Sequence, residues 1–239
     1  MNVLAIGCHP DDLEINAGGT LAKCAKRGDT VTMCVLGNGS AGHKVYSKEE
    51  IAAIRCEEAK SAAAIIGAEY INLDVDDMFL RQNYDLLVKR VSDVIRKARP
   101  DFIITHGPNE YMVDHSITNK IVFDATMAAT VFHYPTDHPE YPVFNKFPPI
   151  FQMENTMLAD SFPDIFVDIT DTVDIKVQMY EQHKSQIEWL RVHDNHDLVE
   201  CMLACAKLRG LQCGTGYVEG FTILKQSYHH LPLKRYLPE

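Results

Sequence analysis

Four ionisable side chains are crowded into one short stretch near the start of the chain. The stretch reads HPDDLE and supplies His9, Asp11, Asp12 and Glu14. It follows the apolar run LAI at residues 4–6, which is typical of a short buried strand. Buried carboxylates are costly unless they are paired or coordinate a metal, so the stretch is a candidate metal site. The alternative on these residues alone is a solvated turn in which an aspartate caps the next helix.

A second stretch with the same character lies at residues 105–115. It reads THGPNEYMVDH, follows the apolar run FIIT at 102–105, and ends in Asp114 and His115. The ligand crevice of a parallel α/β sheet lies beyond the carboxyl ends of its strands, so the two loops are expected to meet. Two histidines and one carboxylate are a usual catalytic zinc pattern with one position left for water. Of two adjacent aspartates, one can ligate while the other takes a proton from that water.

The elements that must position these loops alternate between strand and helix. Ser47 and Glu50 form a capping-box pattern that opens a long helix ending at Gly67. Strands separated by helices of this length predict βαβ units and a parallel sheet with helices on both faces. The predicted strands are 3–7, 30–36, 69–73 and 102–105, and the predicted helices run to about residue 27, from 47 to 67 and from 84 to 98.

The second half of the chain has a different pattern. Residues 133–164 are rich in proline and aromatic side chains and predict an extended loop or arm, residues 165–170 suit a short strand, and residues 175–208 are mostly helical. No linker separates two domains. We therefore predict a single α/β domain over residues 1–239, a Rossmann-like three-layer sandwich with a mostly parallel sheet and a C-terminal helical elaboration.

Composition limits the partners. The chain has 239 residues, 46% hydrophobic and 23% charged, and a formal net charge of −10, which disfavours nucleic acid and anionic membranes as partners. Its opening lacks the features of a signal peptide, and no apolar run approaches the roughly 20 residues that span a bilayer. The seven cysteines are scattered mostly through apolar stretches, as free thiols are in a reducing compartment. We expect a cytoplasmic protein; self-association stays open.

The motifs resemble a known family, the PIG-L/LmbE-like zinc-dependent N-acetylglucosamine deacetylases. That family's first motif is HPDD-x-E followed by Gly-Gly-Thr, and this chain reads HPDDLEINAGGTLAK from residue 9. Its second motif ends in Asp-His, as EYMVDH does at 110–115. Further matches are RCEEAKSAAAIIG at 55–67, PDIFVDIT at 163–170, HKSQ at 183–186 and YVEGF at 217–221.

The resemblance implies a role for each matching residue. His9, Asp12 and His115 would be the zinc ligands, with iron(II) or manganese as other metals that suit them. Asp11 would be the general base, and Asp114 would orient a catalytic or ligating group. Arg55, Asp77 and His183 would contact the substrate, although Asp76 is an equal contender with Asp77 on spacing. The implied reaction removes acetyl from an N-acetylglucosamine-type sugar or conjugate.

One position departs from the family pattern. Many members carry a histidine three residues before the last ligand, where this chain has Met112. A nearby histidine, His106, His229 or His230, could replace it, or proton delivery could run through Asp11 alone. Two other functions stay open: a metal-dependent amidase on a different amide, and a metal-binding protein that has lost activity.

The remaining histidine, cysteine and glycine pairs in the sequence favour structural roles. The pair His193 and His196 is expected to be solvent-exposed, and the pair Cys201 and Cys205 to pack in the core rather than bind metal. Consecutive glycines at 18–19 interrupt a predicted helix at a cost of about 1 kcal/mol each relative to alanine. Close packing of that helix against its neighbours is the expected compensation.

Overall fold

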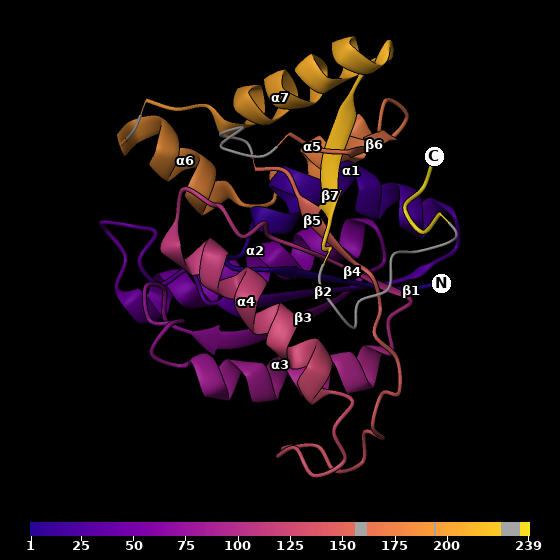
Figure 1. Ribbon diagram of the computed structural model, residues 1–239. Coiled ribbons are helices and arrows are strands. Elements are labelled where there is room, and N and C mark those ends of the chain that lie inside the picture. Colours follow the sequence, from indigo (N-terminus) through magenta and orange to yellow (C-terminus); the bar gives the residue numbers. More distant parts are fainter. Residues whose placement is uncertain (156–161, 194, 226–234) are drawn as a thin grey trace.

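The computed structural model describes residues 1–155, 162–193, 195–225 and 235–239 (Figure 1). In chain order the elements are β1 (Asn2–Gly7), α1 (Asp12–Lys26), β2 (Thr30–Gly37), α2 (Lys48–Ile65), β3 (Glu69–Val75), α3 (Tyr84–Ala98), β4 (Phe102–Thr105), α4 (Val113–Ala128), β5 (Ile150–Met153), β6 (Ile165–Asp168), α5 (Val173–Tyr180), α6 (Lys184–His193), α7 (Leu198–Cys213) and β7 (Val218–Ile223).

The described strands form one sheet in the order β3-β2-β1-β4-β5-β7-β6. The five strands from β3 to β5 are parallel to their neighbours, whereas β7 runs antiparallel to both β5 and β6. Strands from both halves of the chain therefore share one sheet. The predicted mostly parallel α/β sheet is confirmed.

Helices cover both faces of this sheet, as Figure 1 shows: α3 and α4 lie on one face and α1, α2 and α5 on the other. Successive side chains of a strand point to opposite faces, so β1 feeds two cores. Val3 and Ala5 belong to the core under α1, while Leu4 and Ile6 belong to the core under α3 and α4. Together with α6 and α7 near the carboxyl terminus, these layers confirm the three-layer sandwich with a C-terminal helical elaboration.

Prediction and structure agree best where the local sequence pattern is strong. Helix α3 matches the predicted 84–98, and Ser47 forms the predicted capping box with Glu50 at the start of α2. The helical stretch predicted over 175–208 consists of three helices, α5, α6 and α7. The predicted short strand at 165–170 is β6.

The predicted arm over 133–164 needs a correction. Its residues 150–153 form β5, an inner strand that pairs with β4 on one side and β7 on the other. All four residues are buried, because Phe151 and Met153 face one apolar core and Ile150 faces the other. The segment between α4 and β5 has neither helix nor strand before residue 150, so the arm is shorter than predicted.

Other structural expectations hold in the described part of the chain. The seven cysteines are free. A Cβ atom on Gly19 would lie 2.7–2.8 Å from the side chain of Ile169, and one on Gly18 would lie 3.2 Å from Lys176 Cγ. The glycines therefore permit close packing of α1, as expected. No helix within the described residues is both long enough and apolar enough to cross a membrane.

Candidate metal centre and active site

The topology brings the two motif loops together. Strand β1 pairs with β4 in parallel, with Ile6 opposite Thr105, so the loops that follow both strands leave the same edge of the sheet. The first loop carries His9 and Asp12, and the second leads to His115 at the start of α4. All three side chains are buried.

The donor atoms of these three residues converge on one point. His9 Nδ1 lies 3.3 Å from His115 Nε2, His115 Nε2 lies 3.4 Å from Asp12 Oδ1, and His9 Nδ1 lies 3.7 Å from Asp12 Oδ2. Ligands placed ~2.0–2.2 Å from a tetrahedral zinc ion are roughly 3.3–3.6 Å apart. The two distances at His115 Nε2 match this spacing, and a donor set of two histidines and one carboxylate fits a zinc ion held by His9, Asp12 and His115.

The second oxygen of Asp12 is held by protein donors. Its Oδ2 accepts hydrogen bonds from the backbone N–H groups of Cys8 (3.0 Å) and His9 (2.7 Å), and lies 3.1 Å from His106 Nε2. Although burial opposes ionisation, the imidazoles of His115 and His106 hold the pKa of Asp12 well below its usual range. Asp12 is thus fixed as a carboxylate with Oδ1 turned toward His115.

Each candidate histidine ligand has a carboxylate behind it. His9 Nε2 lies 3.6 Å from Asp114 Oδ2, and His115 Nδ1 lies 3.6 Å from Glu110 Oε2. Asp114 Oδ2 also accepts a hydrogen bond from the backbone of Met78, at 2.6 Å. A carboxylate in this position fixes the tautomer and ring orientation of a metal-binding histidine. The geometry fits the role expected for Asp114, and it adds Glu110, which the sequence reasoning missed.

Asp11 occupies a strained and enclosed position. Its backbone has φ of 118°, a conformation that costs energy for a residue with a side chain and that occurs mostly at functional sites. Its Oδ2 lies 3.1 Å from Arg55 Nη2. Burial raises the pKa of Asp11 to about 6, while Arg55 opposes that rise. A carboxylate with a pKa near neutrality suits a general base.

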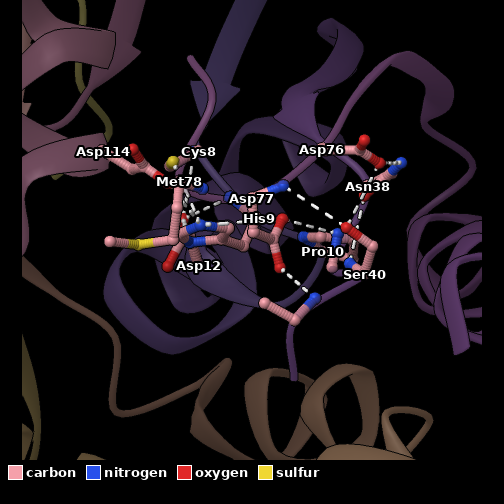
Figure 2. Close-up of polar contacts among 12 residues, drawn as sticks. Cys8, His9, Pro10, Asp12, Asn38, Ser40, Asp76, Asp77, Met78 and Asp114 are labelled. Atoms are coloured by element: carbon pink, nitrogen blue, oxygen red, sulfur yellow. Dashed lines mark hydrogen bonds and ion pairs between the residues drawn. The ribbon is translucent and has the colours of Figure 1, made fainter. Parts of the chain in front are cut away.

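Asp11 and the three candidate ligands line a cavity of about 230 Å³, together with Arg55 and Asp77. Arg55 is buried and its Nη2 also donates to the carbonyl of Pro10. Both oxygens of Asp77 accept backbone hydrogen bonds, from Gly39 at 2.8 Å and Ala41 at 3.0 Å (Figure 2). Asp77 therefore holds the 38–42 loop against the cavity.

The two neighbouring aspartates differ in position. Asp76 lies away from the cavity lining and contacts Asn38, Ser40 and Lys48, the first two drawn in Figure 2. Asp77 lines the cavity.

His183 does not reach the cavity. The side chain is fully buried and its Nε2 lies 3.3 Å from Glu14 Oε1. Another residue of the same HKSQ motif, Gln186, lines the cavity instead. The structure therefore brings the HKSQ motif to the cavity through Gln186, while His183 lies behind it.

The histidines considered as replacements at Met112 are placed unequally. His106 is fully buried behind Asp12 and does not line the cavity, whereas Met112 does. His229 and His230 lie outside the described residues. Tyr111, whose ring meets that of His115 edge-on at 5.2 Å, is a further lining residue that sequence reasoning missed.

The histidine and cysteine pairs near the carboxyl terminus lie outside the cavity lining. His193 is exposed, as expected, and stacks on Trp189, while His196 is half-buried with its Nε2 3.2 Å from Cys201 Sγ. Cys201 and Cys205 are half-buried rather than in the core, because one side of α7 faces solvent. A different cysteine, Cys8, is close to the metal centre, with Sγ 3.5 Å from His9 Nε2. Burial raises the pKa of Cys8 to about 11.

Comparison with known proteins gives two kinds of sequence relative. The chain is 30% identical to the diacetylchitobiose deacetylase of Thermococcus kodakarensis, over 96% of this chain and 85% of the relative. It is also 29% identical to the 4-oxalmesaconate hydratase of Pseudomonas putida, over 73% of this chain and 70% of the relative.

Two solved structures share the fold. The N,N'-diacetylchitobiose deacetylase of Pyrococcus horikoshii superposes with a TM-score of 0.81 at 24% identity, covering 97% of this chain and 86% of that one. The 4-carboxy-2-hydroxymuconate hydratase of Pseudomonas putida superposes with a TM-score of 0.80 at 24% identity over the whole of both chains.

A family model decides the affiliation. The model for GlcNAc-PI de-N-acetylase, PIG-L, matches residues 4–126, which include both motif loops and the helix that carries Arg55. Taken with the 30% identity over nearly the whole chain, this match shows that the chain belongs to the PIG-L family of deacetylases.

Proposed function

We propose that the protein is a zinc-dependent hydrolase that removes the N-acetyl group from an N-acetylglucosamine-type sugar or conjugate. The observation that supports it most directly is Asp11, a strained carboxylate that lines the same cavity as three converging metal-ligand atoms. A solvated turn has no need of this arrangement. Water activation requires a base beside a metal.

The residues divide the work between binding and proton transfer. His9, Asp12 and His115 would hold the zinc ion, which when bound supplies an acidified water and a Lewis acid for the amide carbonyl. Asp11 accepts a proton from the attacking water and delivers it to the leaving nitrogen. Asp114 holds His9 in orientation, and the products are acetate and a free amine.

Arg55 and Asp77 would form the polar side of the substrate site. Arg55 also keeps Asp11 in place through their 3.1 Å ion pair. For His183, whose side chain has no exposed surface, we propose a supporting role behind the cavity, through its contact with Glu14. Because Met112 has no proton to give, Asp11 carries both proton transfers.

A direct test measures metal content and acetate release on a panel of N-acetylglucosamine conjugates. We expect about one metal per chain in the wild type. Asp11→Asn should keep the metal and lose ~10²–10⁴-fold in activity, the usual contribution of a general base. Asp171→Asn, at an exposed position outside the cavity lining, serves as the matched control and should change neither quantity. Absence of metal after reconstitution, or full activity in Asp11→Asn, would contradict the proposal.

Hydration of an unsaturated carboxylate is a second candidate, because the hydratase relative matches 73% of the chain. The charges that line the cavity favour deacetylation over this hydration. Asp11, Asp12 and Asp77 face a single lining cation, Arg55, so even with a divalent ion no excess positive charge is left for an acidic substrate. Loss of ultraviolet absorbance from an unsaturated oxo-dicarboxylic acid, with no acetate released from any amide, would reverse this ranking.

A further inference from the structure

The cavity has two chemically different sides. The polar side consists of the candidate ligands, Asp11, Arg55 and Asp77 described above. The second side, here called the apolar wall, is formed by Ile15, Met78, Tyr111, Met112, Leu190 and Leu198. The proposed chemistry uses only the polar side. The apolar wall therefore needs an explanation of its own.

The backbone of the apolar wall is strained at Met78. Met78 is held with φ of 67°, a left-handed backbone that side-chain-bearing residues seldom adopt. The hydrogen bond from its N–H to Asp114 ties this turn to the start of α4, where Met112 lies. Met78 is 60% exposed and Met112 36% exposed. Large apolar side chains kept in solvent beside a cavity indicate a ligand-binding surface.

The apolar surface continues outward from the cavity. Phe79 and Val113, the next residues after Met78 and Met112, are 51% and 60% exposed. Helices α1, α6 and α7 supply the remaining apolar contacts through Ile15, Leu190 and Leu198. The cavity of about 230 Å³ is below the ~300–1,000 Å³ of ordinary ligand sites, so we expect a substrate larger than one sugar ring to extend onto this surface.

The chemistry of the apolar wall selects among substrates. A second sugar ring carries hydroxyl groups that lose hydrogen bonds to water on entering, and methionine and leucine side chains cannot replace those bonds. Apart from the candidate ligands, the Gln186 amide and the single hydroxyl of Tyr111 are the uncharged polar side-chain groups among the lining residues, too few for the several hydroxyl groups of a second ring. An alkyl or aryl group, in contrast, gains free energy in proportion to the apolar area that it buries.

We propose that the preferred substrate carries an alkyl or aryl group attached to its N-acetylated sugar, and that this group packs on Met78, Met112 and Leu190. The inference rests on the proposed deacetylase function and specifies its substrate class. Its occupant is part of the substrate, because the apolar wall is continuous with the cavity that holds Asp11.

The experiment compares acetate release from the methyl, phenyl and octyl β-glycosides of N-acetylglucosamine and from N,N'-diacetylchitobiose. We expect kcat/KM for the phenyl or octyl compound to exceed that for the methyl compound by ~10-fold or more, chiefly through KM, because apolar area is buried. Chitobiose should behave like the methyl compound. Met78→Ser and Met112→Ser should each lower the octyl-to-methyl ratio, whereas the control Val192→Ser, at an 80% exposed position outside the cavity lining, should not.

The outcomes separate the two proposals. Equal kcat/KM for the methyl and octyl compounds, or a strong preference for chitobiose, overturns the inference and leaves the deacetylase function standing. Bound metal with no acetate from any compound overturns the deacetylase function itself. If Met78→Ser turns an oligomer into a monomer in sedimentation without changing the ratio, the apolar wall is a contact between copies of the chain, and the inference is wrong.

Discussion

At the scale of single residues, every candidate metal ligand is backed by a buried ionisable partner. Glu110 is central to this arrangement because it serves two histidines: its Oε2 lies 3.6 Å from His115 Nδ1 and its Oε1 lies 3.6 Å from His106 Nδ1. His106 in turn contacts Asp12. Asn155 Nδ2 donates to Glu110 Oε2 at 2.8 Å and fixes the carboxylate. Against the cost of burial, His106 and His115 lower the pKa of Glu110 to about 2, so the carboxylate stays ionised.

We predict that Glu110→Gln weakens zinc binding by ~10–100-fold, the usual effect of losing such a partner. The amide keeps the size of the side chain but removes the charge that fixes His115 and His106. Competition with a chromophoric chelator measures the affinity. Glu57→Gln, at an exposed position on α2, is the control. Unchanged affinity in Glu110→Gln, with equal thermal stability of the metal-free forms, would show that Glu110 only fills space.

The difference between Glu110 and the residues found from sequence is instructive. His9, Asp11 and Asp12 are neighbours in the chain and directly follow a strand, so their grouping is visible in the sequence. Glu110 is separated from His115 by the end of a loop and the first residues of α4, and only the folded chain turns its carboxylate back under the histidine. The burial of His183 against Glu14 depends in the same way on α5 packing beside α1.

At the scale of elements, the close approach of α1 to the residues after β6 depends on Gly19. A Cβ there would lie 2.7–2.8 Å from Ile169, a fully buried residue. We predict that Gly19→Ala lowers the free energy of unfolding by up to ~2 kcal/mol, since an overpacking cost of ~1–3 kcal/mol outweighs the ~1 kcal/mol gain in helix propensity. Urea denaturation measures the change.

Gly18→Ala is the matched control for this prediction, because it makes the same change one position earlier in α1. Its Cβ would meet Lys176 Cγ at 3.2 Å, a milder overlap than the 2.7–2.8 Å contacts at Gly19. We expect a smaller loss of stability than at Gly19. Equal effects of the two substitutions would show that the packing against Ile169 is not the cause.

Elements with strong local signals were predictable, and those defined by their partners were not. Helix α3 alternates apolar and polar residues with a helical period and was predicted to the residue. Strands β5 and β7 have four and six residues, and β7 contains Gly220. Their strand conformation comes from pairing across the sheet, Phe151 with Ile223 and Met153 with Phe221, which no local pattern in the sequence records.

At the scale of the whole molecule, the candidate metal centre lies beyond the carboxyl ends of β1 and β4, while two large apolar cores lie on the two faces of the sheet. The fold therefore does not depend on the metal as a small zinc-binding domain does. Binding to the folded state alone still adds stability by mass action, ~2.7 kcal/mol when free metal is 100 times its dissociation constant.

We therefore predict that chelation lowers the melting temperature by several degrees, with full recovery when zinc is restored, while far-ultraviolet circular dichroism at 25 °C stays unchanged. His9→Ala is the comparison, because loss of one ligand should weaken zinc binding. The melting temperature of this variant should therefore be nearly the same with and without zinc. If the metal-free protein loses its helical signal at 25 °C, the metal holds the sheet edge together, and the two apolar cores are not sufficient for folding. If zinc leaves the melting temperature of the wild type unchanged at saturating concentration, the three converging donor atoms do not form a zinc site.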